Sequence, residues 1–202
     1  MIRLALLRHG ATAWSAERRI QGRSDIPLSA EGREQVAGWR LPPDLLSADW
    51  YASPLARARD TAALIVKGAV TVEPRLAEMH WGAWEGRTLS ELRREFGPGH
   101  VDRNRLGFDF RPPGGESPRE LLARVSSWLA DVTARGRPVA AVTHRGVLRV
   151  LYASAVGWDM RDEPPQPLRD DALHLFDCDV DGGIRLVRLN LPLVVASAKA
   201  GP

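Results

Sequence analysis

The stretches IRLALLRHG (residues 2–10) and PVAAVTHRG (residues 138–146) decide the fold of this 202-residue chain. In each stretch an apolar run ends abruptly in a histidine, an arginine and a glycine. A short apolar run of this kind is typical of a buried strand. The two stretches therefore predict two buried strands that deliver His9 and His144 into loops at their carboxyl ends.

Strand-like and helix-like segments alternate between and after these two stretches. Two capping boxes, Thr88 with Glu91 and Ser117 with Glu120, mark helix starts with little ambiguity. A pair of alternating segments joined by Asp-Gly-Gly predicts a C-terminal hairpin. The further strands are expected at residues 49–52, 70–74, 172–179 and 184–190. The helices are expected after Ser29, Pro54, Thr88, Ser117 and Gly146.

This alternation predicts one α/β domain over residues 1–202, a three-layer sandwich with a mostly parallel central sheet and helices on both faces. Such sheets bind ligands beyond the carboxyl ends of their strands. Polar clusters follow three strands, at Arg8-His9, at residues 53–57 and at His144-Arg145. We expect them to meet in one crevice, covered by the Pro- and Gly-rich segment at about 97–116.

Composition limits the class of protein. With 44% hydrophobic and 26% charged residues, the chain matches an ordinary globular domain. Its longest apolar stretch falls well short of the roughly 18 residues that suggest a membrane span, and residues 1–7 are too short for a signal-peptide core. Cys178 is the one cysteine, which excludes an intrachain disulfide. A cytoplasmic protein without membrane contact is expected.

The formal charge of +3 does not by itself indicate nucleic acid. The basic residues are 26 Arg and 2 Lys, scattered along the chain and interleaved with acidic residues. A nucleic-acid site would concentrate them on one face or in one run. We therefore expect a mixed-charge surface and no nucleic-acid partner, with a local positive pocket left open.

The polar clusters suit an anion. Two arginines beside two histidines, without a cysteine or a dense carboxylate cluster, match the oxygens of phosphate, because guanidinium forks form paired hydrogen bonds with them. Histidine can attack phosphorus as a covalent nucleophile. The leaving alkoxide then needs an acid, and Glu78, after the third strand, is the candidate.

Six ordered motifs resemble the histidine phosphatase superfamily, in its phosphoglycerate-mutase-like branch. They span about three quarters of the chain, so the resemblance is specific, whereas a lone Arg-His-Gly would not be. The motifs are LRHGATAW (7–14), ERRIQGRSDIPLS (17–29), SPLARARDTA (53–62), EMHWGAWEG (78–86), PPGGES (112–117) and VTHRG (142–146).

The resemblance implies a catalytic set. His9 is implied as the nucleophile that becomes phosphohistidine, and Glu78 as the general acid and then base. Three residues are implied to hold the phosphoryl oxygens, namely Arg8, Arg57 and His144. The resemblance also implies hydrolysis without a metal or an organic cofactor.

Three further residues match positions that line the phosphate pocket. Gln21 and Gly22 are implied as substrate-binding residues. Relatives often carry Asn where this chain has Ser15. Since a hydroxyl is shorter than an amide and lacks its two donors, Ser15 is expected to reach phosphate weakly or through water.

Other interpretations of these residues remain. His9 and His144 are also compatible with a zinc site or with satisfied interior histidines, although neighbouring arginines would repel a cation. Arg59 and Arg145, beside motif residues, are expected to form structural ion pairs. The three histidines outside the motifs, His80, His100 and His174, are expected to be surface or structural. Trp14, Trp81 and Trp84 fit the crevice wall and the core equally well.

The preferred function is a phosphomonoesterase acting on a small phosphorylated metabolite. The alternatives are a phosphoglycerate mutase primed by a bisphosphate and, less favoured, a catalytically silent phosphate-binding module. Candidate substrates by resemblance are phosphoglycerates, α-ribazole phosphate and nonspecific organic phosphates. No pattern in the sequence indicates the oligomeric state, and a homodimer is compatible with it.

Overall fold

One six-stranded sheet organises the chain, whose computed structural model describes residues 1–97 and 106–193. Its strand order is β3-β2-β4-β1-β5-β6. The strands are β1 (Ile2–Arg8), β2 (Asp49–Ala52), β3 (Val70–Val72), β4 (Val139–Thr143), β5 (Ala172–Cys178) and β6 (Ile184–Pro192). The first four run parallel, β5 runs antiparallel to its neighbour β1, and β6 runs antiparallel to β5 and so in the direction of the first four. The predicted hairpin and the mostly parallel sheet are confirmed.

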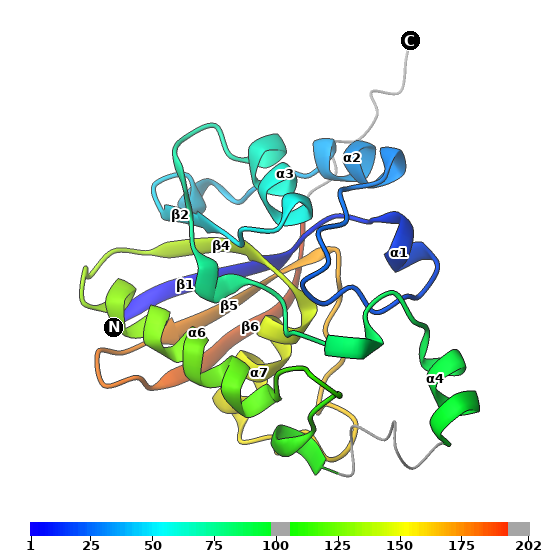
Figure 1. Cartoon of the computed structure of the whole chain (residues 1–202). Helices are drawn as coiled ribbons and strands as arrows, with labels where there is room; N and C mark the ends of the chain where they lie inside the picture. The colour runs from blue at the N-terminus through cyan, green and yellow to red at the C-terminus, as the bar shows by residue number, and fades with distance from the viewer. Residues whose placement is uncertain (98–105, 194–202) are drawn as a thin grey trace.

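Helices cover both faces of this sheet, with α2 and α3 on one face and α6 and α7 on the other (Figure 1). The predicted three-layer α/β sandwich is therefore confirmed. The α-helices are α1 (Ala13–Ala16), α2 (Ala30–Ala37), α3 (Ala56–Ile65), α4 (Leu89–Phe96), α6 (Pro118–Thr133) and α7 (Arg145–Val156). The 3-10 helices are η1 (Pro43–Leu45), η2 (Pro74–Leu76), η3 (Gly82–Trp84) and η5 (Gly107–Asp109).

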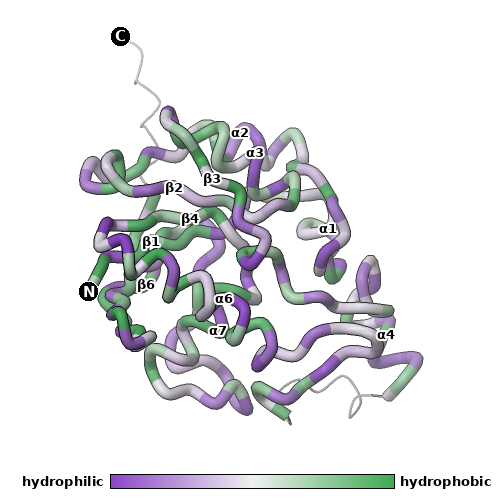
Figure 2. Tube along the Cα trace, turned by 60° about the vertical axis from the view of Figure 1, so that its left-hand side comes forward, coloured by the Kyte–Doolittle hydropathy of each residue, from purple (hydrophilic) through white to green (hydrophobic). Residues whose placement is uncertain are grey.

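The central strand β1 is buried on both sides, which explains its continuous apolar run. Leu4 and Leu6 belong to the core beneath α6 and α7, whereas Ala5 and Leu7 belong to the core beneath α2 and α3. Successive strand residues point to opposite faces. Figure 2 shows the resulting hydrophobic colouring along β1 and β4, in the middle of the molecule.

Local signals place the helix starts. Ser29 caps α2 by accepting from the backbone of Gly32. Reciprocal capping boxes begin α4 at Thr88 and α6 at Ser117, as the sequence predicts. Such a cap satisfies backbone N–H groups that the helix itself leaves without partners.

Two parts of the chain differ from or go beyond the expectations. Helix α1 is not predicted, because its capping box joins Thr12 to Ser15 rather than to a glutamate. In the described part of the expected crevice-covering segment, Phe110 is buried against Trp81 and Trp84. Residues 98–105 of that segment lie outside the described residues.

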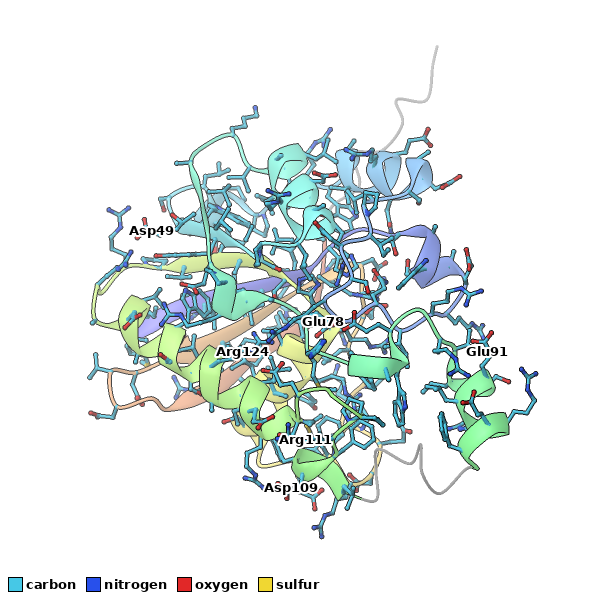
Figure 3. All side chains as sticks on the ribbon, viewed as in Figure 1. Asp49, Glu78, Glu91, Asp109, Arg111 and Arg124 are labelled. Atoms are coloured by element: carbon cyan, nitrogen blue, oxygen red, sulfur yellow. The ribbon has the colours of Figure 1, made fainter. Side chains whose placement is uncertain are left out.

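Many of the scattered arginines form ion pairs at the periphery, as the interleaved charges suggest. Arg119 Nε contacts Asp109 Oδ1 at 2.7 Å, and Arg3 Nε contacts Asp177 Oδ1 at 2.8 Å. In Figure 3, Asp109 lies at the lower edge of the molecule, whereas Glu78 lies near its centre. Within the described ranges, no helix combines the length and apolarity needed to cross a membrane.

Candidate active site

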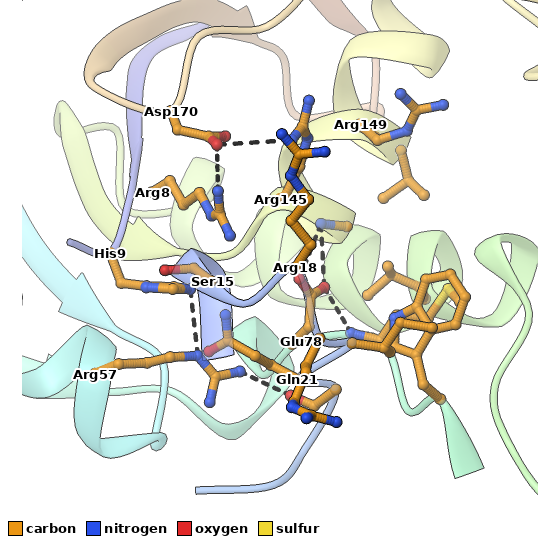
Figure 4. A pocket seen from close by; sticks show the side chains of 18 of the residues that line it. Arg8, His9, Ser15, Arg18, Gln21, Arg57, Glu78, Arg145, Arg149 and Asp170 are labelled. Atoms are coloured by element: carbon orange, nitrogen blue, oxygen red, sulfur yellow. Dashed lines mark hydrogen bonds and ion pairs between the residues drawn. The ribbon is translucent and has the colours of Figure 1, made fainter. Parts of the chain in front are cut away.

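A cavity of about 810 Å³ opens at the carboxyl ends of the parallel strands. Four of the predicted catalytic residues line it, namely Arg8, His9, Arg57 and Glu78. They come from β1 and the loop after it, from α3, and from the segment between η2 and η3. The crevice expected from the strand ends is thus present, and its residues lie together in Figure 4.

His9 is held as one defined tautomer at the end of β1. Its Nδ1 lies 2.7 Å from the carbonyl oxygen of Gly10, which can only accept, so Nδ1 donates. Its Nε2 lies 3.2 Å from Arg57 Nε, which can only donate. Nε2 therefore carries the lone pair. Burial, assisted by the positive charges of Arg8 and Arg57, holds the pKa of His9 well below its usual value.

Arg57 is fully buried in the first turn of α3. Its Nη2 donates to the carbonyl oxygen of Gly22 at 2.7 Å, and its Nη1 donates to that of Ser24 at 2.8 Å. Burial lowers the pKa of Arg57 from its usual value, although the nearby Glu78 acts to raise it. The guanidinium is therefore fixed at both ends, with Nε facing His9.

Glu78 is oriented by backbone donors. The N–H of Gly146, in the first turn of α7, lies 3.1 Å from both carboxylate oxygens, and the N–H of Met79 donates to Oε1 at 2.8 Å. A Cβ at position 146 would meet Glu78 Oε1 at 2.2 Å, so the site requires glycine there. Glu78 is buried apart from a small exposed surface facing the cavity.

His144 lies beside His9, and the centroids of the two rings are 5.1 Å apart. It is fully buried and does not itself line the cavity. Its Nε2 lies 2.6 Å from the hydroxyl of Ser53, which fixes the ring. Burial, followed by the charge of Arg57, lowers the pKa of His144 well below its usual value. Its implied contact with phosphoryl oxygens stays a prediction.

Arg8 belongs to an ion-pair network that sequence reasoning missed. Its Nη1 pairs with Asp170, and the same carboxylate lies 3.6 Å from Arg145 Nη1 (Figure 4). Arg145, expected to form a structural pair, does form one, but it also lines the cavity. Arg149 lines the cavity from the next turn of α7. Arg145 and Arg149 are four positions apart, which places both on one face of a helix. This spacing is the sequence pattern from which Arg149 could have been predicted.

The three residues predicted to bind substrate take different positions. Gln21 and Gly22 both line the cavity. Gln21 is mostly buried, and Gly22, at φ +53°, contributes its carbonyl oxygen to Arg57. Ser15 also lines the cavity, but its hydroxyl donates to Thr12 O and accepts from Thr12 N, both at 2.8 Å. This engagement agrees with a weak or indirect contact with phosphate, which stays a prediction.

Among the described residues, buried polar atoms without partners occur in the core, at Trp84 Nε1 and Trp128 Nε1, and at or beside the cavity. Within the described ranges, the buried atoms Arg8 Nε, Gln21 Oε1 and His144 Nδ1 have no hydrogen-bond partner. Buried polar groups are normally satisfied, and each of these three side chains carries an N–H donor suited to an anion. No group of three His, Cys, Asp or Glu side chains suited to a metal ion occurs in residues 1–97 and 106–193. The donor set favours an oxyanion.

The remaining candidates are distributed as follows. His174 is fully buried and its Nε2 contacts Arg169 O at 3.1 Å, and His80 lies 3.8 Å from Glu85. Neither lines the cavity with the predicted catalytic residues. His100 is outside the described residues. Trp81 lines the cavity, whereas Trp84 belongs to the core.

The buried histidines make stability depend on pH. The native state keeps His9 and His144 neutral, whereas the unfolded chain protonates them at their usual pKa of about 6.5. The unfolded state then binds more protons, so the free energy of unfolding decreases as pH falls below that value. Each fully neutral histidine accounts for about 1.4 kcal/mol of this loss between pH 7.5 and 5.5. Urea unfolding at both pH values measures it.

His9→Gln is the matched variant for this prediction. It should lose the share of His9, about 1.4 kcal/mol, and retain the rest, because His144 and the buried His174, whose pKa burial also lowers, still titrate between the two states. Equal free energies of unfolding at pH 7.5 and 5.5 in the parent protein would contradict the buried neutral state of both rings.

The family model of the histidine phosphatase superfamily (branch 1) matches residues 4–192. Among curated proteins, a probable phosphoglycerate mutase GpmB of Salmonella paratyphi C is 35% identical over 185 residues, covering 88% of this chain and 85% of the relative.

Solved structures are similar over almost the whole chain. A mycobacterial glucosyl-3-phosphoglycerate phosphatase in complex with inorganic phosphate has a TM-score of 0.82 at 27% identity, covering 97% of this chain and 100% of its own. The alpha-ribazole phosphatase from Shigella flexneri has a TM-score of 0.80 at 26% identity, with the same coverage.

Proposed function

Because the chain belongs to the histidine phosphatase superfamily (branch 1), we propose that it is a phosphomonoesterase that hydrolyses a small phosphorylated metabolite through a phosphohistidine. The observation that carries the proposal is the state of His9, whose Nδ1 donates to Gly10 O so that Nε2 keeps its lone pair beside a buried arginine. A neutral imidazole is the form that attacks phosphorus.

In the first step, His9 Nε2 attacks phosphorus and the bond from phosphorus to the substrate's alkoxy oxygen breaks. Arg8 and Arg57 stabilise the negative charge on the phosphoryl oxygens, in a site where burial strengthens electrostatic interactions. Glu78, in its protonated form, gives its proton to the departing oxygen. The products of this step are the free alcohol and a phosphohistidine.

In the second step, a water molecule attacks the phosphohistidine. Glu78, now a carboxylate, takes one proton from this water, and the bond from His9 to phosphorus breaks. Inorganic phosphate leaves and His9 returns to its neutral state. The glutamate therefore exchanges its acid role for a base role within one turnover.

The alternative is a phosphoglycerate mutase primed by a bisphosphate, and the 35% identity to a probable phosphoglycerate mutase favours it. The two functions share the first step and differ in what accepts the phosphoryl group, water or a second hydroxyl of the bound substrate. Phosphorus NMR of the chain with a phosphoglycerate and a bisphosphate separates them. We expect inorganic phosphate to accumulate faster than the isomerised phosphoglycerate.

Activity is expected to survive exhaustive chelation, because the arginines supply the positive charge that a metal would otherwise provide. The measurement is phosphate release from a panel of phosphomonoesters before and after dialysis against EDTA. Vanadate should inhibit both preparations by mimicking five-coordinate phosphorus. A loss of activity that zinc or magnesium restores would overturn the metal-independent mechanism.

A further inference from the structure

Glu85 is a carboxylate behind the wall of the cavity that the proposed mechanism does not use. It follows η3, and its side chain is 13% exposed. Oε1 accepts from the N–H groups of Arg23 at 2.9 Å and Trp81 at 3.1 Å. Oε2 accepts from the N–H of Ser24 at 2.8 Å and from its hydroxyl at 2.6 Å. The four donors match the roughly four lone-pair sites of a carboxylate.

These bonds hold Glu85 in its charged form. Burial acts to raise the pKa of Glu85, but the hydrogen bonds from Ser24, Arg23 and Trp81 outweigh it, and the pKa lies below its usual value. A mostly buried carboxylate with this many donors is costly to replace, because donors would lose their partner.

The loop held by Glu85 is the loop that holds Arg57. The carbonyl oxygens of Gly22 and Ser24 accept from the two terminal nitrogens of Arg57, which leaves its Nε facing His9. Gly22 has φ +53°, and a Cβ there would meet Glu85 Oε1 at 2.0 Å. The carboxylate and the glycine therefore fit each other closely, and a continuous chain of contacts runs from Glu85 to the nucleophile.

We propose that Glu85 is a positioning residue for phosphoryl transfer, which fixes residues 22–24 so that their carbonyl groups aim the Arg57 guanidinium at His9. The inference rests on the proposed function. Glu85 does not line the cavity, so its effect on the reaction passes through Arg57. Misplacement of a catalytic group by about 1 Å can cost a factor of about 100 in rate.

Glu85→Gln tests the inference. Glutamine replaces one of the two carboxylate oxygens by an NH2 group, which cannot accept from a backbone N–H. The hydrogen bonds to that oxygen are therefore lost. We expect kcat for p-nitrophenyl phosphate to fall by about 10- to 100-fold in a folded protein. Burial lowers the pKa of His9 most, and the charges of Arg8 and then Arg57 lower it further. When Arg57 moves away, the acid limb of kcat/KM should shift to higher pH.

Two comparisons separate positioning from general structural support. Glu120→Gln is the matched control, because Glu120 closes the capping box of α6 and pairs with Arg111 outside the cavity. It should lower the melting temperature without moving the acid limb. Ser24→Ala removes one of the four donors and should shift the limb in the same direction as Glu85→Gln, with a smaller loss of kcat. All variants are measured with the same substrate, so the ionisation of the substrate phosphate affects every pH profile equally.

A folded Glu85→Gln variant with the parent's kcat and acid limb overturns the inference. If that variant does not fold, Ser24→Ala decides, and an unmoved limb with unchanged kcat overturns the inference in the same way. Trapping of phosphohistidine on the parent protein tests the proposed function separately, so the two failures are distinguishable.

Discussion

His9→Ala is expected to lower kcat by roughly 10⁴- to 10⁶-fold, the scale observed when a covalent nucleophile is removed from an enzyme. Within residues 1–97 and 106–193, the imidazole nearest to it is that of His144, which is fixed by Ser53 and does not line the cavity, so it cannot take the place of His9. The sheet should stay intact, since His9 contributes its backbone N–H, and not its ring, to the bond with Thr143 O. Steady-state phosphate release measures the loss, and circular dichroism measures the fold.

His80→Ala is the matched control for this loss. His80 is 41% exposed and contacts Glu85 at 3.8 Å rather than the catalytic cluster. Its removal should leave kcat near that of the parent, because Glu85 keeps its hydrogen bonds from Arg23, Ser24 and Trp81. A kcat for His9→Ala within about tenfold of the parent, in a folded protein, would contradict covalent catalysis by this residue.

Glu78→Gln is expected to reduce turnover of an alkyl phosphate by about 100- to 10,000-fold, the usual scale of general acid catalysis. An alkoxide is strongly basic and needs a proton as it leaves, whereas p-nitrophenolate leaves without much help. The loss on p-nitrophenyl phosphate should therefore be much smaller. The amide oxygen of glutamine can still accept from the N–H groups of Gly146 and Met79, so the geometry is retained.

Glu163→Gln provides a control inside the same cavity, since Glu163 lines it and has no place in the proposed mechanism. It should affect both substrates weakly and equally. The comparison holds under conditions in which formation of the phosphoenzyme limits the rate. Equal losses on the two substrates for Glu78→Gln would remove the acid role from Glu78.

The strands and helix caps were predictable because their signals are local. β1 and β4 carry continuous apolar runs since both faces of each strand are buried, and Ser117 closes a capping box within four residues. Helix α1 escaped prediction because Ser15 replaces the usual glutamate of a capping box. The residue type of Ser15 does not indicate whether its hydroxyl binds Thr12 or a ligand, and only the structure distinguishes the two.

The candidate site was predictable where a residue follows a strand end, as His9 does. Asp170 was not, because it meets Arg8 across 162 positions of chain, and no pattern in the sequence relates the two. Glu85 was missed for a different reason. Its partners are backbone N–H groups, which leave no mark on residue types, and its closeness to Gly22 depends on a positive φ.

The most direct test of the proposed function is to trap the phosphoenzyme from a radiolabelled phosphomonoester and to map its position. The account predicts a phosphate on the peptide that contains His9, stable after an alkaline quench and lost after an acid quench, because phosphohistidine hydrolyses in acid. An adduct that is stable in acid and labile in alkali would indicate an acyl phosphate on a carboxylate, and would contradict the account.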